Sequence, residues 1–165
     1  MPTVFSSSYD ANPISIDSDT LTGYDVQIPY GDVPGIGIVP FITLDGSISV
    51  KDGTFADFDS GTVVYVTALK YRPDSEFLVE TLDDAYDTTK FEWEDLASAE
   101  TLDFSLVVPS NTIAYLWAYA DANANGLLNE SGEKVASGGD DDNGKLSTGT
   151  ESTTDILLEL ADGSE

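Results

Sequence analysis

Residues 113–120 read Ile-Ala-Tyr-Leu-Trp-Ala-Tyr-Ala and form the longest uninterrupted apolar run in the chain. The large residues Ile113, Tyr115, Trp117 and Tyr119 stand at every second position. This period of two is typical of a β-strand. Because both faces of this strand are apolar, we expect it to be buried on both sides and to lie centrally in a sheet. The run is far shorter than the roughly 20 residues that a membrane-spanning helix needs.

The same alternation recurs on both sides of this run and predicts further strands. These are Tyr24–Tyr30, Ile36–Leu44, Ser47–Val50, Thr62–Leu69, Leu102–Val108 and Ile156–Leu160. Turn or hairpin signals separate the runs. They are Asp45-Gly46, Asp52-Gly53, Asp59-Ser60-Gly61, Pro109-Ser110-Asn111 and Asn143-Gly144. Only Glu76–Tyr86 and Phe91–Ala99 leave room for a helical turn. The pattern predicts an all-β protein, an antiparallel β-sandwich of the immunoglobulin or prealbumin type with roughly seven to nine strands.

The first forty residues differ in composition from the remainder of the chain. They hold five of the seven prolines, together with many Ser and Asp residues. Proline confines a strand to a sheet edge and favours extended backbone. We therefore divide the chain into an extended N-terminal segment, residues 1–40, and a β-sandwich, residues 41–165. The segment is either an edge strand of its own sandwich or an arm that pairs with a neighbouring subunit.

The charge of the chain is strongly negative, with 31 Asp and Glu residues against 6 Lys and Arg residues and a net charge of −25. Such a surface repels phosphate backbones and anionic lipid, which argues against nucleic acid and membrane partners. The chain has no His and no Cys, so histidine-dependent triads, thiol nucleophiles and zinc sites built from these residues are excluded. The acidity is typical of a surface suited to high salt, of cation binding, or of both.

One loop carries a chemical signature, and it follows the apolar run directly. Oxygen-bearing side chains occupy its first, third, fifth and ninth positions, and a glycine occupies the sixth, as in an EF-hand-type calcium loop. The candidate ligands are Asp121, Asn123, Asn125, the backbone carbonyl of Leu127, and Asn129. Alternate side chains point inward as such a loop curls around an ion, and the glycine permits the sharp turn.

The closing ligand of this loop is ambiguous. A carboxylate normally occupies the twelfth position, where this chain has Gly132, and Glu133 follows one residue later. Either a one-residue bulge lets Glu133 close the site, or Glu130 takes that role. Neutral Asn ligands in a flexible loop favour Ca²⁺ over Mg²⁺. A second acidic cluster, Asp140–Asp142, either lends a carboxylate to this site, binds its own ion, or is a solvated turn.

Four stretches together resemble a prealbumin-like β-sandwich module. They are residues 42–50, 61–69, 104–109 and 118–136. Such modules recur in bacterial surface proteins and lipoproteins and are similar to carboxypeptidase-regulatory-like domains. Many carry a calcium loop after the penultimate core strand that ends in Gly-Glu. The resemblance covers about residues 42–160 and implies Asp121, Asn123, Asn125 and Glu133 as metal ligands.

Catalytic signals in the chain are weak. Asp59-Ser60-Gly61 matches the aspartic protease signature, but it is interpreted as the turn that opens a strand, and Glu92 and Glu94 lie two apart on one predicted strand face. We therefore expect no catalytic residues and a non-catalytic structural protein of the cell surface or extracellular space. Ca²⁺ is the expected cofactor and self-association the expected partnership, into a filament, tubule or surface layer. The alternative is a carbohydrate-binding or adhesion module, with Trp93 as the stacking residue and a glycan or another surface protein as partner.

Overall fold

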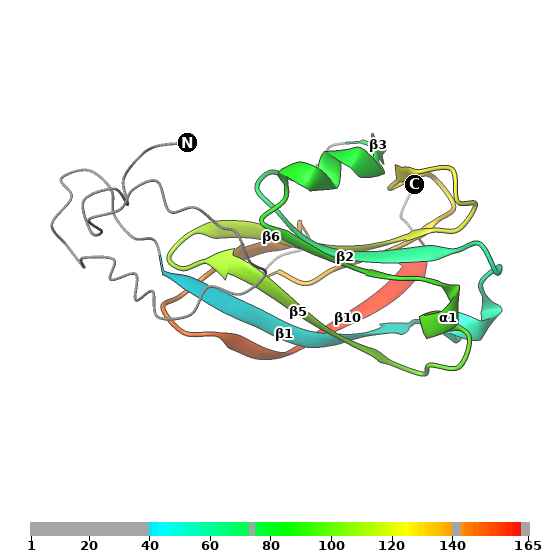
Figure 1. The fold of residues 1–165 in the computed structure, drawn as a ribbon, viewed down its shortest axis with the longest axis horizontal. Helices are drawn as coiled ribbons and strands as arrows, with labels where there is room; N and C mark the ends of the chain where they lie inside the picture. Colours follow the sequence, from blue (N-terminus) through cyan, green and yellow to red (C-terminus); the bar gives the residue numbers. More distant parts are fainter. Residues whose placement is uncertain (1–39, 73–74, 140–142, 163–165) are drawn as a thin grey trace, which may run out of the picture. The chain divides into compact units, whose positions relative to one another are not determined.

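The structure is a computed structural model that describes residues 40–72, 75–139 and 143–162 (Figure 1). The predicted strand Tyr24–Tyr30, the rest of the N-terminal segment up to residue 39, and the acidic cluster Asp140–Asp142 lie outside the described residues. The predictions made for these parts therefore stay predictions.

Strands dominate the described part of the chain, so the prediction of an all-β protein is confirmed. The strands are β1 (Phe41–Val50), β2 (Val63–Leu69), β3 (Phe77–Leu78), β4 (Asp87–Phe91), β5 (Leu102–Pro109), β6 (Ile113–Asp121), β7 (Leu127–Leu128), β8 (Lys134–Ser137), β9 (Lys145–Ser147) and β10 (Thr153–Asp162). The short helical elements are η2 (Phe55–Asp57), η3 (Val79–Asp84) and α1 (Trp93–Leu96). The described strands number ten rather than seven to nine, and β3, β7 and β9 have only two or three residues each. Both η3 and α1 fall in the ranges that left room for helical turns.

Eight strands form one nearly closed sheet, and β3 and β7 form a small second sheet. The large sheet has the order β4-β2-β6-β8-β10-β1-β5, with β9 also paired to β6. The pairing of β1 with β10 is parallel, whereas the other pairings are antiparallel. The sheet is therefore mixed rather than purely antiparallel. Parallel pairing needs a long connection between the strands, and here the rest of the sheet forms that connection.

The Asp45-Gly46 signal does not form the predicted turn. Both residues lie inside β1, which runs unbroken from Phe41 to Val50 and is irregular in its pairing with β10 at this point. A Cβ atom on Gly46 would stand 2.2 Å from the backbone oxygen of Ile156. The glycine is therefore required by the close approach of β10, and the two strands predicted around it are one.

The two edge strands of the large sheet lie next to each other. The Asp87 carboxylate on β4 accepts the backbone N–H of Val107 on β5 at 2.8 Å. The Thr89 hydroxyl donates to the backbone oxygen of Ser105 at 3.4 Å. Side chains of one edge thus bind backbone groups of the other, which protects both edges from pairing with another chain.

Strand β6 is central, as its alternation predicts, with β2 on one side and β8 and β9 on the other. Its alanines and Leu116 are buried in the main core. That core also contains the inward-facing residues of β1, β2, β5 and β10, including Phe104, Leu106 and Val108 of β5. The opposite face of β6 contributes Tyr119 to a second core with Leu69, Leu82 and Leu128. Trp117 is half-buried rather than fully buried, because it packs at the margin of this second core.

A segment that we call the flap, residues 77–85, covers the second core. It comprises β3 and η3, which lie over the β2–β6 face in Figure 1. The Phe77 ring packs edge-on against Tyr119 with ring centroids 5.3 Å apart. The Tyr119 ring in turn stacks on Trp117 at 5.8 Å. The flap thus buries Tyr119, whereas Tyr115 and Trp117 on the same face of β6 are half-buried and Ile113 is exposed. The alternation does not itself identify this covering segment.

Candidate metal centre

The metal loop, residues 121–133, begins at the last residue of β6. Asp121 is 3% exposed, so its carboxylate is buried at the base of the loop. One carboxylate oxygen accepts the backbone N–H of Asn125 at 3.1 Å, and the other accepts that of Gly126 at 3.0 Å. The loop therefore curls around Asp121, and Gly126 makes the turn with a positive φ of 76° that glycine adopts without strain.

The two central asparagines continue this curl. The Asn123 side-chain oxygen accepts the Asn125 N–H at 3.0 Å, and the Asn125 side-chain oxygen accepts the Leu127 N–H at 2.7 Å. Both amide nitrogens donate to one carboxylate oxygen of Glu130, at 3.1 and 2.8 Å. The spacing of alternate polar residues thus places Asp121, Asn123 and Asn125 in one hydrogen-bonded network, together with Glu130.

Glu133 closes the base of the loop from the other end. It is 5% exposed, and its Oε1 accepts the backbone N–H of Ala122, next to Asp121, at 2.8 Å. Its Oε2 is buried and has no hydrogen-bond donor among the described residues. Burial raises the pKa of the Glu133 carboxyl above its usual value, and the neighbouring charges of Asp121 and Glu130 raise it further, against the opposing Ala122 bond.

A buried carboxylate oxygen without a partner is costly. A cation beside it would remove that cost, because the cation would supply the missing partner and offset the negative charge. Of the two carboxylates considered for closing the loop, Glu133 has this property. Glu130 instead binds the asparagine amides, so the geometry favours Glu133 as the closing ligand.

The two remaining candidate ligands, Leu127 and Asn129, contribute no side chain to this network. Leu127 belongs to β7, where it is paired with Leu78 of the flap. Asn129 is half-buried and has a positive φ of 64°. No hydrogen bond joins the Asn129 side chain to the network within the described loop. Across residues 40–72, 75–139 and 143–162, no three carboxylates gather as a metal-binding group. An ion here would therefore need amide and backbone oxygens beside Asp121 and Glu133.

The loop also anchors the flap, a connection that the sequence patterns do not reveal. The Val79 N–H donates to the Gly126 carbonyl at 2.8 Å, and β3 pairs with β7 beside it. The sequence indicates the need for a covering segment only indirectly, because a strand that is apolar on both faces must be covered on each face. The metal loop thus holds the segment that buries Tyr119.

The residues considered for other activities have structural positions. Asp59 lies in an exposed turn in which the Thr62 N–H donates to its carbonyl at 2.9 Å. Glu92 and Glu94 do not share a strand face, because Glu92 caps α1 and Glu94 lies in its first turn. Trp93 is half-buried and packs against the main core.

Comparisons with known proteins give little further information. No protein-family profile matches the chain, and no curated protein matches it. Among solved structures, an alternative pilotin from the type II secretion system of Vibrio cholerae is similar over 75% of this chain and 100% of that chain, with 12% identity and a TM-score of 0.41. Within the described residues, no helix is long and apolar enough to cross a membrane.

Proposed function

We propose that this protein is a non-catalytic, calcium-binding structural protein of the cell surface or extracellular space, and that it self-associates with the support of calcium. The observation that carries the calcium proposal is the buried, unpartnered Oε2 of Glu133 beside the buried carboxylate of Asp121. The loop network around these two carboxylates supports it.

In this proposal the ion is held by the loop alone. Asp121 and Glu133 supply the charged ligands, Asn123, Asn125 and Asn129 supply neutral oxygens, and Leu127 supplies its carbonyl. Few charged ligands and a flexible loop favour Ca²⁺ over Mg²⁺, with a dissociation constant of about 10⁻⁴–10⁻³ M, as in extracellular modules. When bound, the ion neutralises the two buried carboxylates and ties β6, β7 and the start of β8 together.

We also propose that the sheet is a β-sandwich of the prealbumin-like type. The main core supports this assignment, because alternate residues of β2 and β6 pack there against alternate residues of β1, β5 and β10. In Figure 1, the β2–β6 pair and the β1, β5 and β10 strands form two layers. The candidate calcium loop directly follows a core strand, as in modules of that type, although this strand, β6, is followed by β8 and β10 and is not the penultimate one.

The self-association part of the proposal rests on charge. A chain of −25 repels its copies at low salt, so an assembly needs cations or salt to screen the carboxylates. Calcium does this most efficiently where it binds specifically. The N-terminal segment remains a candidate arm for pairing with another copy.

A calcium titration of thermal stability tests the metal site. Binding to the folded state alone stabilises it by about 2.7 kcal/mol when calcium is near 100 times its dissociation constant. We expect chelation to lower the melting temperature and Asp121→Ala to abolish that difference. Asp59→Ala, which removes an equally charged but exposed carboxylate, should retain it. No calcium-dependent shift up to about 100 mM, which is 100 times the upper end of the expected dissociation constant, would reject the metal site.

A further inference from the structure

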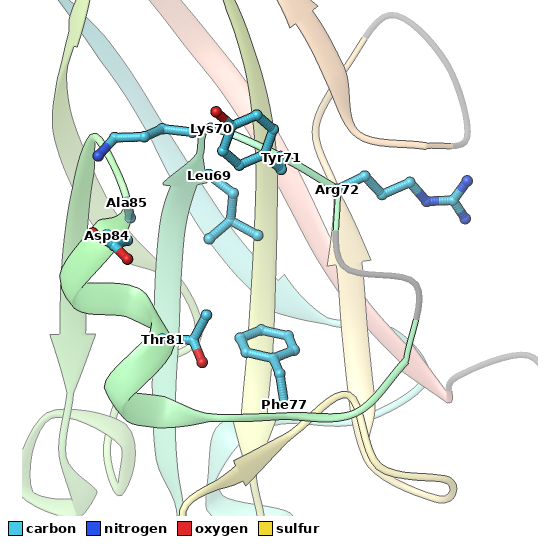
Figure 2. Close-up of a pocket in the computed structure, with 8 residues that line it drawn as sticks. All are labelled: Leu69, Lys70, Tyr71, Arg72, Phe77, Thr81, Asp84 and Ala85. Carbon is cyan, nitrogen blue, oxygen red and sulfur yellow. The ribbon is translucent and has the colours of Figure 1, made fainter.

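An apolar cavity of about 160 Å³ lies between the flap and the end of β2. Figure 2 shows Leu69 and Phe77 pointing toward each other across it, with Thr81 of η3 at one side. The ring of Tyr71, 82% exposed, stands at its opening. An apolar cavity of about 150 Å³ accommodates a benzene molecule, so this one has room for a single branched aliphatic side chain.

Two basic side chains flank the opening. Lys70 and Arg72 lie on either side of Tyr71 in the sequence, and in Figure 2 they extend in opposite directions from the cavity. They are two of only six basic residues in a chain with 31 acidic ones. Lys70 also lies over the Tyr86 ring at 5.9 Å, and Arg72 donates to the Asn143 side chain. Asp84 lines the same cavity, so the lining carries two positive charges and one negative charge.

The outer face of β10 has the complementary chemistry. Leu157 is 78% exposed there, the most exposed large aliphatic side chain of the described residues. Exposed Glu159 follows it by two residues, about 7 Å away along the extended strand, and exposed Asp155 precedes it by two residues at a bulge where its φ is 62°. An apolar side chain between two carboxylates matches an apolar cavity between two cations.

We propose that Leu157 of one copy inserts into the Leu69–Phe77–Tyr71 cavity of a second copy, with Asp155 and Glu159 placed against Lys70 and Arg72. This inference rests on the proposed self-association and names the surfaces that carry it. A tyrosine that is exposed in the single chain, as Tyr71 is, and becomes buried on contact is a common anchor in protein interfaces. The carboxylates add specificity, because acidic residues far outnumber basic ones on this chain and repel each other in most placements of one copy on another.

The contact joins two different surfaces, so it is heterologous. Each copy keeps a free Leu157 at one side and a free cavity at the other, and such contacts produce rings or open filaments rather than closed dimers. The inference therefore explains how a chain of this charge extends an assembly by one repeated contact.

Mixing two blocked variants tests the contact. Leu157→Asp removes the inserted side chain, and Thr81→Trp fills the cavity from an exposed position on η3. In sedimentation velocity at about 0.15 M salt and millimolar calcium, we expect each variant alone to stay monomeric. The mixture should form a 1:1 dimer and nothing larger, because each variant retains the half that the other lacks. Val107→Asp, an exposed apolar position on β5, is the matched control and should assemble as the unmodified chain does.

Truncation and charge reversal give independent measurements. Leu157→Ala should weaken association about tenfold to a hundredfold, as expected for losing one buried leucine side chain. Lys70→Glu should weaken it as well, and combining it with Glu159→Lys in the same chain should restore part of the loss. Assembly that is unchanged by Leu157→Asp and Thr81→Trp would overturn this inference and leave the proposed self-association standing. A chain that stays monomeric at all salt and calcium levels would overturn both.

Discussion

On one face of β6, Leu116 and its neighbouring alanines are sealed by strands from across the large sheet. On the other face, Tyr119 lies beneath the flap, which is held by the metal loop. The first face is entirely apolar. The second includes a buried Tyr119 hydroxyl with no hydrogen-bond partner in the described part of the chain, and burial raises the pKa of that hydroxyl.

Strand β6 thus contributes to two cores that differ in what closes them. The buried residues of the main core are apolar and need no hydrogen-bond partner, and the large sheet closes this core together with Phe55 of η2 and Leu96 of α1. The second core depends on Leu128 and on the β3–β7 pairing, both adjacent to the proposed ligands. We therefore expect the main core to be indifferent to calcium and the second core to respond to it.

The largest expected effect separates the two cores directly. Leu116→Ala should cost about 2–5 kcal/mol of unfolding free energy, because it leaves a cavity in a fully buried site. Leu128→Ala should cost a similar amount and also weaken calcium binding, since Leu128 lies in the metal loop. Urea unfolding with calcium and with chelator measures both quantities. If Leu116→Ala reduces the calcium-dependent stabilisation as much as Leu128→Ala does, the two cores do not differ in their response to calcium.

The second prediction examines how tightly the main core is packed at β1. Gly46→Ala should destabilise the protein by about 1–3 kcal/mol, since the added methyl group meets the Ile156 backbone oxygen and the Phe104 ring. Gly61→Ala is the matched control, because its Cβ would meet only Ala124 at 3.8 Å. Thermal unfolding of both variants measures the difference. Equal melting temperatures would show that β1 and β10 can separate without cost.

The smallest expected effect concerns pH. Because burial raises the folded-state pKa of Glu133 above its ordinary 4.5, the folded protein holds this proton to higher pH than the unfolded chain does. Without calcium, its contribution to stability therefore falls as pH rises from 4.5 through the folded pKa. Glu133→Gln should remove that fall, raise stability at neutral pH by about 1 kcal/mol, and abolish the calcium response.

Glu130→Gln is the control for this pH experiment, because Glu130 binds the asparagine amides in a more exposed position. Chemical unfolding between acidic and neutral pH, with chelator present, gives the two profiles. If the Glu133→Gln profile runs parallel to that of the unmodified protein, the Glu133 carboxylate is not desolvated. The main core carries no titratable group of this kind in the described residues, so its variants should show no such pH dependence.

The candidate site was predictable because its parts are local. Every proposed ligand lies within residues 121–133, and the alternate positions 121, 123 and 125 form one hydrogen-bonded network in the curled loop. The spacing of the loop left Glu130 and Glu133 both open as the closing ligand, because both are within reach along the chain, and only the family resemblance implied Glu133. Burial against Ala122 distinguishes them, and burial is a property of the packed structure.

The sequence by itself determined the all-β class, the strand at residues 113–120 with its two apolar faces, and the oxygen-rich loop after it. Short-range periodicity encodes these features, because side-chain direction repeats every two residues in a strand. Only the tertiary structure decided that Asp45-Gly46 lies within a strand, that β1 pairs in parallel with β10, and that the flap covers Tyr119. Each of these features depends on contacts between segments that are far apart in the chain. A local sequence pattern does not indicate which distant segment packs against it.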